Sequence, residues 1–151
     1  MYSPHYESAM REKFWSSFGR YVSPVTSASG EKINWVNYKT GIKNIQFKMT
    51  AGKSEAVINI EITGEAQKIN KLFILFLSFK LGFEKGFERK WKWIPEKVQV
   101  DGKVIACIFC SLEEASIFNK EDWPTLITFF KTSMITLDEF WVTHKEIFLN
   151  N

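Results

Sequence analysis

Apolar side chains recur every three or four residues in three stretches of the chain, which is the period of an α-helix. The first stretch predicts a helix that begins at Pro4 and ends before Pro24. The second predicts one long helix over Glu65–Phe87. The third predicts a helix that begins close to Asp122 and continues to Phe148.

Alternating apolar and polar residues, the pattern of a half-buried strand, fill the intervals between these helices. Three such segments precede the second helix and two follow it, and we expect them to form antiparallel strands. The dipeptide Asp101-Gly102 separates the last two and favours the tight turn of a β-hairpin. The five expected strands cover residues 33–39, 44–49, 56–63, 97–100 and 103–112.

The sequence therefore predicts a single α+β domain over residues 1–151. Its elements follow the order α-β-β-β-α-β-β-α, with a mostly antiparallel sheet of about five strands packed against long helices. A chain of 151 residues can bury one core but is short for two. We expect its 14 Phe and 6 Trp to fill that core.

Composition and charge exclude several classes of protein. The net charge of +3 falls short of the basic stripe of a dedicated nucleic-acid binder. No stretch approaches the roughly 18 apolar residues of a membrane helix. The first residues have neither the basic start nor the apolar run of a secretory signal. We expect a cytoplasmic protein that has no membrane partner.

Residues that commonly carry chemistry are few and scattered. The two histidines, His5 and His144, are far apart in the sequence. Cys107 and Cys110 fall in an expected strand, where residues three apart face opposite sides and cannot converge on one metal ion. The glycines form no phosphate-binding motif. We therefore expect no metal site, no cofactor and no preassembled catalytic centre.

Glu61 is the one acid that invites a catalytic interpretation. The order of helix, three strands and helix matches the core of restriction-type nucleases, in which neighbouring strands supply carboxylates and a lysine to a divalent ion and the attacking water. In this chain the lysine position is Thr63, and the expected strand over 44–49 contains no acid. The alternatives are a nuclease-related enzyme, a catalytically inactive remnant of that fold, and a solvent-facing glutamate without a role in chemistry.

Two segments combine aromatic and basic side chains, which together can stack bases and neutralise phosphates. Asn37, Tyr38 and Lys39 lie at an expected hairpin tip, where polar side chains build no core. Trp91 and Lys92 lie in the second segment. For both, the alternative is a solvated strand edge protected by lysines. The basic residues are Lys32, Lys39 and Lys43 in the first segment and Lys85, Arg89, Lys90, Lys92 and Lys97 in the second.

Four segments in combination resemble one known family. They are Phe14–Gly19, Ile33–Gly41, Phe118–Pro124 and Leu137–Trp141. Together they are similar, over nearly the whole chain, to the bacterial domain-of-unknown-function family numbered four-two-six-eight (DUF4268). The resemblance implies a stand-alone member of a family in which other members carry the domain behind a nuclease-like portion. It implies an association with nucleic-acid processing or defence, and no established activity.

These observations predict a non-enzymatic binding or assembly module. The surplus of aromatic residues suggests a homodimer or another protein partner, and nucleic acid is a second kind of partner that the basic segments allow. The alternative is the nuclease-related enzyme, or its inactive remnant, built around Glu61.

Overall fold

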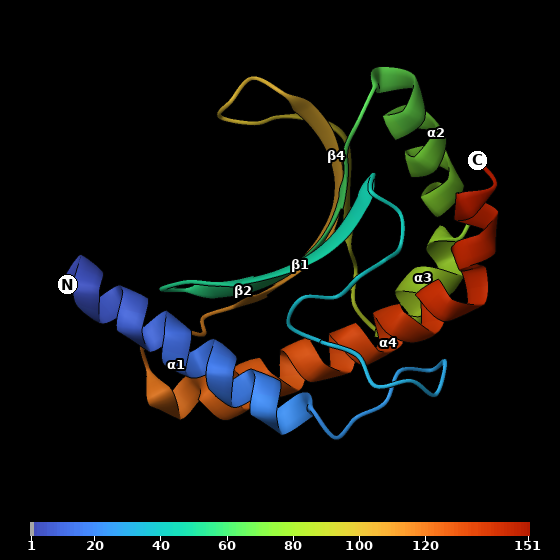
Figure 1. The fold of residues 1–151 in the computed structure, drawn as a ribbon. Coiled ribbons are helices and arrows are strands. Elements are labelled where there is room, and N and C mark those ends of the chain that lie inside the picture. Colours follow the sequence, from blue (N-terminus) through green and yellow to red (C-terminus); the bar gives the residue numbers. More distant parts are fainter. Residues whose placement is uncertain (1) are drawn as a thin grey trace.

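The computed structural model describes residues 2–151, in which four antiparallel strands form one curved sheet with helices along its convex side (Figure 1). This arrangement confirms an α+β fold with an antiparallel sheet. In chain order the elements are α1 (Pro4–Val22), β1 (Ile45–Ala51), β2 (Glu55–Ile62), α2 (Ala66–Leu77), α3 (Lys80–Phe87), β3 (Lys92–Val98), β4 (Val104–Glu113), the short 3₁₀-helix η1 (Lys120–Asp122) and α4 (Trp123–Leu149).

The first and last helices begin where the sequence predicts. The Ser3 hydroxyl accepts a hydrogen bond from the Tyr6 backbone N–H at 3.1 Å, and Pro4 is the first residue of α1. Proline is tolerated there because the first N–H groups of a helix have no partner inside it. Pro124 is the second residue of α4, which runs for 27 residues, and lies in its first turn. No helix of the described residues combines the length and the apolar character needed to cross a bilayer.

The predicted long helix over Glu65–Phe87 is wrong, because the chain forms two helices there, α2 and α3. Between them the Ser78 hydroxyl donates to the Leu75 carbonyl oxygen at 2.6 Å. Phe79 then leaves the helical conformation, with φ of −103° and ψ of 5°. A serine hydroxyl bonded to the preceding turn favours such a bend. The break gives α3 its own direction beside α4 (Figure 1).

The predicted strand over 33–39 is also wrong, and these residues belong to an ordered loop over residues 23–44. The Asn34 side-chain oxygen accepts hydrogen bonds from the backbone N–H groups two and three residues later, both at 3.1 Å. A turn of this kind bends the backbone away from an extended course. The Trp35 indole N–H donates to the Val25 carbonyl at 2.9 Å and holds the bend against the start of the loop. The sheet of the described chain therefore has four strands rather than five.

The strands lie in the order β1-β2-β4-β3, so that β1 and β3 form the two edges. The predicted hairpin is confirmed between β3 and β4. Gly102 has φ of 85°, and the Gln99 N–H donates to the Lys103 carbonyl at 2.8 Å across the turn. The strand expected over 97–100 instead covers Lys92–Val98. Its start is earlier because Lys92 pairs with β4.

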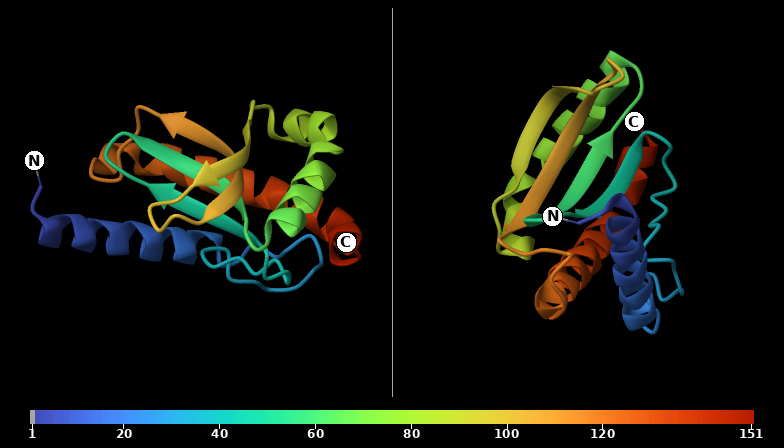
Figure 2. Two further views of the ribbon diagram at one scale, coloured as in Figure 1. Left: turned by 90° about the horizontal axis from the view of Figure 1, so that it is seen from above. Right: turned by 90° about the vertical axis from the view of Figure 1, so that its left-hand side faces the viewer.

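Helices cover the convex face of the sheet, and no helix of the described chain lies against the concave face (Figures 1 and 2). On β2, Ile58, Ile60 and Ile62 are fully buried towards the helices, whereas Asn59 and Glu61 alternate onto the concave face. The expectation that large rings fill the core is confirmed. The largest fully buried aromatic side chains are Phe14, Phe18, Phe76, Phe130, Trp141 and Phe148.

The two cysteines face opposite sides of β4, as their spacing predicts. Cys110 lies opposite Ile58 in the core, and Cys107 lies opposite Glu61 on the concave side. Both thiols are free and buried. Burial raises the pKa of Cys110 to about 12 and also raises the pKa of Cys107. Both are therefore protonated at neutral pH and behave as packing residues.

Glu84 connects α3 to β3 and gives a test of this packing. Its carboxylate accepts hydrogen bonds from the Trp91 backbone N–H at 3.0 Å and from the Trp93 indole N–H at 3.2 Å. The bond from Trp91 is the main reason that the pKa of Glu84 lies below its ordinary value of 4.5. We expect Glu84→Ala to lower the free energy of unfolding by about 1 kcal/mol at pH 7, measured by urea denaturation.

The pH dependence provides the control. A folded pKa below the ordinary value means that the stabilisation is present above that value and is lost as the pH falls through the folded pKa. The difference between wild type and Glu84→Ala should therefore shrink as the pH is lowered below 4.5. Glu12→Ala on the exposed side of α1 serves as the matched variant for the loss of one carboxylate. A constant difference at all pH values would contradict the prediction.

Candidate functional site

The buried carboxylate of Asp138 fastens loop 23–44 to α4. Asp138 is 1% exposed and lies in the middle of the helix. Its oxygens accept hydrogen bonds from the Ser27 hydroxyl at 2.9 and 3.1 Å, from the Ala28 backbone N–H at 2.7 Å and from the Tyr38 hydroxyl at 2.6 Å. All three donors are neutral and belong to the loop. The charge of this carboxylate is thus satisfied by the loop itself.

Aromatic rings extend the same attachment. The Trp141 indole N–H, one turn after Asp138, donates to the Thr40 carbonyl at 2.8 Å. The Tyr38 ring stacks on Phe47 of β1 with ring centroids 5.2 Å apart, and Phe47 contacts Trp141 edge to face at 5.4 Å. Loop, strand and helix therefore hold one another at a single position.

Burial raises the pKa of the Tyr38 hydroxyl above its ordinary value of 10.0, and the neighbouring Asp138 raises it further. The hydroxyl stays protonated at any physiological pH and keeps donating to the carboxylate. Tyr38 therefore acts as a fixed hydrogen-bond donor and cannot serve as a general base.

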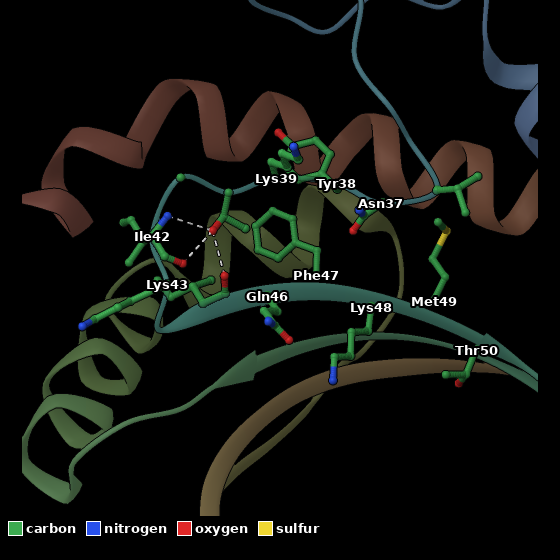
Figure 3. A pocket seen from close by; sticks show the side chains of 14 residues that line it. Asn37, Tyr38, Lys39, Ile42, Lys43, Gln46, Phe47, Lys48, Met49 and Thr50 are labelled. Atoms are coloured by element: carbon green, nitrogen blue, oxygen red, sulfur yellow. Dashed lines mark hydrogen bonds between the residues drawn. The ribbon is translucent and has the colours of Figure 1, made fainter.

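Two hollows, each of about 510 Å³, lie on either side of the short segment Asn37–Lys39. The first hollow runs along the free edge of β1, between residues 36–43 of the loop and the strand (Figure 3). The second hollow lies between residues 27–39 of the loop and α4. Asn37, Tyr38 and Lys39 line both hollows, so the structure places these three predicted binding residues at a concave surface. They lie in a loop rather than at the expected hairpin tip.

Lysines surround both hollows. Lys39, Lys43 and Lys48 line the first, and Lys32, Lys39 and Lys145 line the second. Among residues 2–151, Lys48 is the one member of this set that forms an ion pair, with Glu61 at 2.9 Å. Glu31 lines the second hollow as an acid. The remaining four ammonium groups give this surface a positive potential that favours anionic ligands.

Glu61 does not itself line either hollow and lies on the concave face of the sheet, next to Lys48 of the first hollow. Lys48 contacts one of its carboxylate oxygens, and the Asn59 side-chain amide donates to the other at 3.3 Å. The adjacent β1 contains no acid, and the residue two positions after Glu61 is Thr63, where the nuclease hypothesis would need a lysine. Among residues 2–151, no three His, Cys, Asp or Glu side chains are grouped so that they could hold a metal ion.

Trp91 and Lys92 lie on the opposite edge of the sheet and are not brought together with Tyr38. Trp91 is 5% exposed and packs between Phe83 and Phe87, with ring centroids 4.9 and 4.7 Å away. Lys92 is exposed, and its ammonium lies 5.9 Å from the centre of the Phe109 ring. The buried Trp91 ring offers no free face for a nucleic-acid base, so the arrangement favours a packing role for it.

Sequence reasoning missed Asp138 and Lys145 as members of the site. A signal for Asp138 was present, because an aspartate interrupts the apolar positions of a helix between Leu137 and Trp141. Lys145 carried no comparable signal. Its place depends on the path of a loop that is about 100 residues away in the sequence, as the separation between Tyr38 and Asp138 illustrates.

Removing the Tyr38 hydroxyl tests the attachment. Tyr38→Phe leaves Asp138 with one donor fewer, and we expect the free energy of unfolding at pH 7 to fall by about 1–3 kcal/mol. The matched control is Tyr21→Phe, since Tyr21 is 55% exposed. Urea denaturation followed by tryptophan fluorescence measures both. Equal stability of the two variants would rule out the attachment.

The same pair of variants has a pH signature. Because the pKa of Tyr38 is higher in the folded chain than its ordinary value of 10.0, the protonated hydroxyl stabilises the fold fully below pH 10.0. This stabilisation is lost as the pH rises through the folded pKa. The difference between wild type and Tyr38→Phe should therefore shrink above pH 10.0.

Comparison with known proteins adds a family and no activity. No curated protein and no solved structure matches the chain. The family model described as "Domain of unknown function (DUF4268)" matches residues 10–145. This range includes the loop, β1 and the part of α4 that carry Tyr38, Asp138 and Lys145, and it confirms the resemblance found in the sequence. The chain belongs to the DUF4268 family.

Proposed function

We propose that this protein is a non-enzymatic binding module that holds nucleic acid against loop 23–44. The observation that carries the proposal is a set of four lysines around two adjoining hollows, Lys32, Lys39, Lys43 and Lys145, which form no ion pair within residues 2–151. Nucleic-acid backbones carry regularly spaced negative charges, and lysines that neutralise them release bound counterions. Two hollows separated by a short segment suit a strand that passes from one to the other.

The fixed position of the loop supports this proposal. A binding surface that is already ordered loses little conformational entropy when a ligand binds. Here Asp138 and Trp141 attach the loop to a 27-residue helix before any ligand arrives. Binding residues on a loop held by a rigid scaffold are a common arrangement in proteins.

The contacts available are mainly electrostatic. Tyr38 uses its hydroxyl on Asp138 and one ring face on Phe47, so it is not a free stacking platform. Asn37 and Lys39 are exposed and point away from the core. We therefore expect binding that tolerates many base sequences and depends strongly on salt.

Replacing one lysine tests this surface. We expect Lys39→Gln to weaken binding of a labelled single-stranded oligonucleotide by about three- to tenfold and to reduce the slope of log affinity against log salt by about 1. Fluorescence anisotropy at several salt concentrations measures both. The control is Lys13→Gln on the exposed side of α1, which has the same net charge as Lys39→Gln and should leave the affinity unchanged. A salt-independent affinity, or equal effects of the two variants, would contradict the proposal.

A nuclease-related activity around Glu61 is the second candidate, and the carboxylate–lysine contact with Lys48 is the observation that favours it. Against it, both oxygens of Glu61 are already engaged, by Lys48 and Asn59. We expect no cleavage of single- or double-stranded DNA with Mg²⁺ or Mn²⁺, measured on gels over several hours. Cleavage by the wild type that is lost in Glu61→Ala would instead establish the enzyme.

A protein partner, including a second copy of the chain, remains part of the prediction from sequence. The aromatic side chains among the large exposed apolar residues are Tyr2, Tyr6 and Tyr21. Most of the aromatic surplus therefore fills the core of one chain. Gel filtration with light scattering would measure the oligomeric state directly.

A further inference from the structure

We infer that the second hollow is a phosphate-binding site centred on the ammonium group of Lys145, and that Gly41 leaves the space which this ammonium occupies. The inference rests on the proposed function, because it names the chemical group that one part of the proposed surface binds. It adds a specific cation, a specific position for it and a residue that sets this position.

The position of Lys145 follows from how α4 meets the loop. Lys145 lies one turn after Trp141, whose indole N–H is bonded to the Thr40 carbonyl. Gly41 follows Thr40 in the loop, and the Lys145 side chain extends across Gly41. A Cβ atom at Gly41 would lie 2.5 Å from Lys145 Nζ and 2.9 Å from its Cε. The ammonium thus takes the place where any other residue would carry its side chain.

The Lys145 ammonium has no protein partner within residues 2–151. It forms no ion pair within 4.0 Å, and it takes part in no hydrogen bond of the described side chains. Its residue is half-buried. A partly buried ammonium loses some of its hydration, and an anionic ligand would replace the lost contacts.

The surroundings of Lys145 favour a phosphate. Lys32 and Lys39 line the same hollow, together with the hydroxyl-bearing Ser29 and the acid Glu31. Counting the buried Asp138 carboxylate, which is bonded to Ser27 and Tyr38 of the same hollow, three ammonium groups face two carboxylates and leave an excess of positive charge. A phosphate offers several strong acceptor oxygens and is commonly bound by lysines acting as point charges. A hollow of about 510 Å³ accommodates a phosphate with part of its nucleotide.

Gly41 provides the means to move the ammonium without removing its charge. Its φ of +82° matches the φ of +85° at Gly102 in the β3–β4 turn. Alanine is strained in this conformation at both positions. Nothing lies within 4 Å of a Cβ at Gly102, whereas at Gly41 the Cβ displaces the flexible end of Lys145. Gly41→Ala and Gly102→Ala therefore share the backbone strain and differ in the position of Lys145.

The experiment measures oligonucleotide affinity for four variants by anisotropy, with thermal melting to establish that each is folded. We expect Lys145→Gln and Gly41→Ala each to weaken binding by about three- to tenfold and to lower the salt slope by about 1. Gly102→Ala should bind as wild type. The double variant Gly41→Ala/Lys145→Gln should be no weaker than Lys145→Gln alone, because both changes remove the same contact.

Inorganic phosphate serves as a direct probe of the hollow. It should compete with the oligonucleotide for wild type at lower concentrations than for Lys145→Gln. Two oligonucleotides, one with and one without a 5′-phosphate, then show which phosphate of the strand occupies the hollow. If the wild type binds the phosphorylated oligonucleotide more tightly, the site holds the phosphate at a strand end. If the wild type binds both oligonucleotides equally while Lys145→Gln and Gly41→Ala bind more weakly, the site holds an internal phosphate.

Failure of the inference and failure of the proposed function are distinguishable. If Lys39→Gln weakens binding while Lys145→Gln and Gly41→Ala bind as wild type, the phosphate site at Lys145 is wrong and the proposed surface stands. If none of the lysine variants changes affinity, both are wrong. If Gly102→Ala weakens binding as much as Gly41→Ala, backbone strain explains the effect and the role of Gly41 is rejected.

Discussion

The hydrogen bonds to the buried carboxylate of Asp138 are the constraint on which the surface of this protein depends. An unpaired charge is unfavourable away from water, and here no lysine or arginine among the described residues forms an ion pair with it. Its donors come from residues 27, 28 and 38, which span most of loop 23–44. The loop must therefore adopt this one path for the carboxylate to be satisfied.

This constraint explains how a segment without regular secondary structure can form a defined surface. Within the loop, Trp35 and Thr40 are buried, whereas Val36, Asn37 and Lys39 between them are exposed and Tyr38 is half-buried. The bonds of Asp138 and Trp141 lie beneath the loop, whereas Lys32 and Lys39 of the loop are exposed. Polar groups of the loop thus have two separate tasks. Those facing inward fix its position, and those facing outward remain available to a ligand.

The parts of the fold that local sequence determines were predictable. The cap at Ser3, the proline in the first turn of α4 and the Asp101-Gly102 turn each depend on neighbouring residues. The errors occurred where a polar side chain changes the course of the backbone. Ser78 bends a continuous apolar pattern into two helices, and Asn34 turns an alternating pattern into a loop. The spacing of apolar residues carries no information about these two side-chain hydrogen bonds.

The candidate site was predictable only in part, for a related reason. Asn37, Tyr38 and Lys39 stood out as polar residues without a place in the core, although a hairpin was the wrong setting for them. Asp138 and Lys145 depend on contacts with residues about 100 positions earlier in the chain, which no local pattern encodes. Trp91 shows the converse, since its basic neighbours suggested a surface role while its ring lies inside the core.

The placement of the two thiols on opposite faces of β4 has a use in studying how the molecule opens. Neither sulfur reacts readily while its strand is covered, because alkylating reagents attack the thiolate and need access to it. Cys110 becomes accessible when the helical layer separates from the sheet, and Cys107 becomes accessible when the side chains above the concave face move aside. Pulse alkylation followed by mass spectrometry would therefore time these two fluctuations separately in a single unlabelled chain.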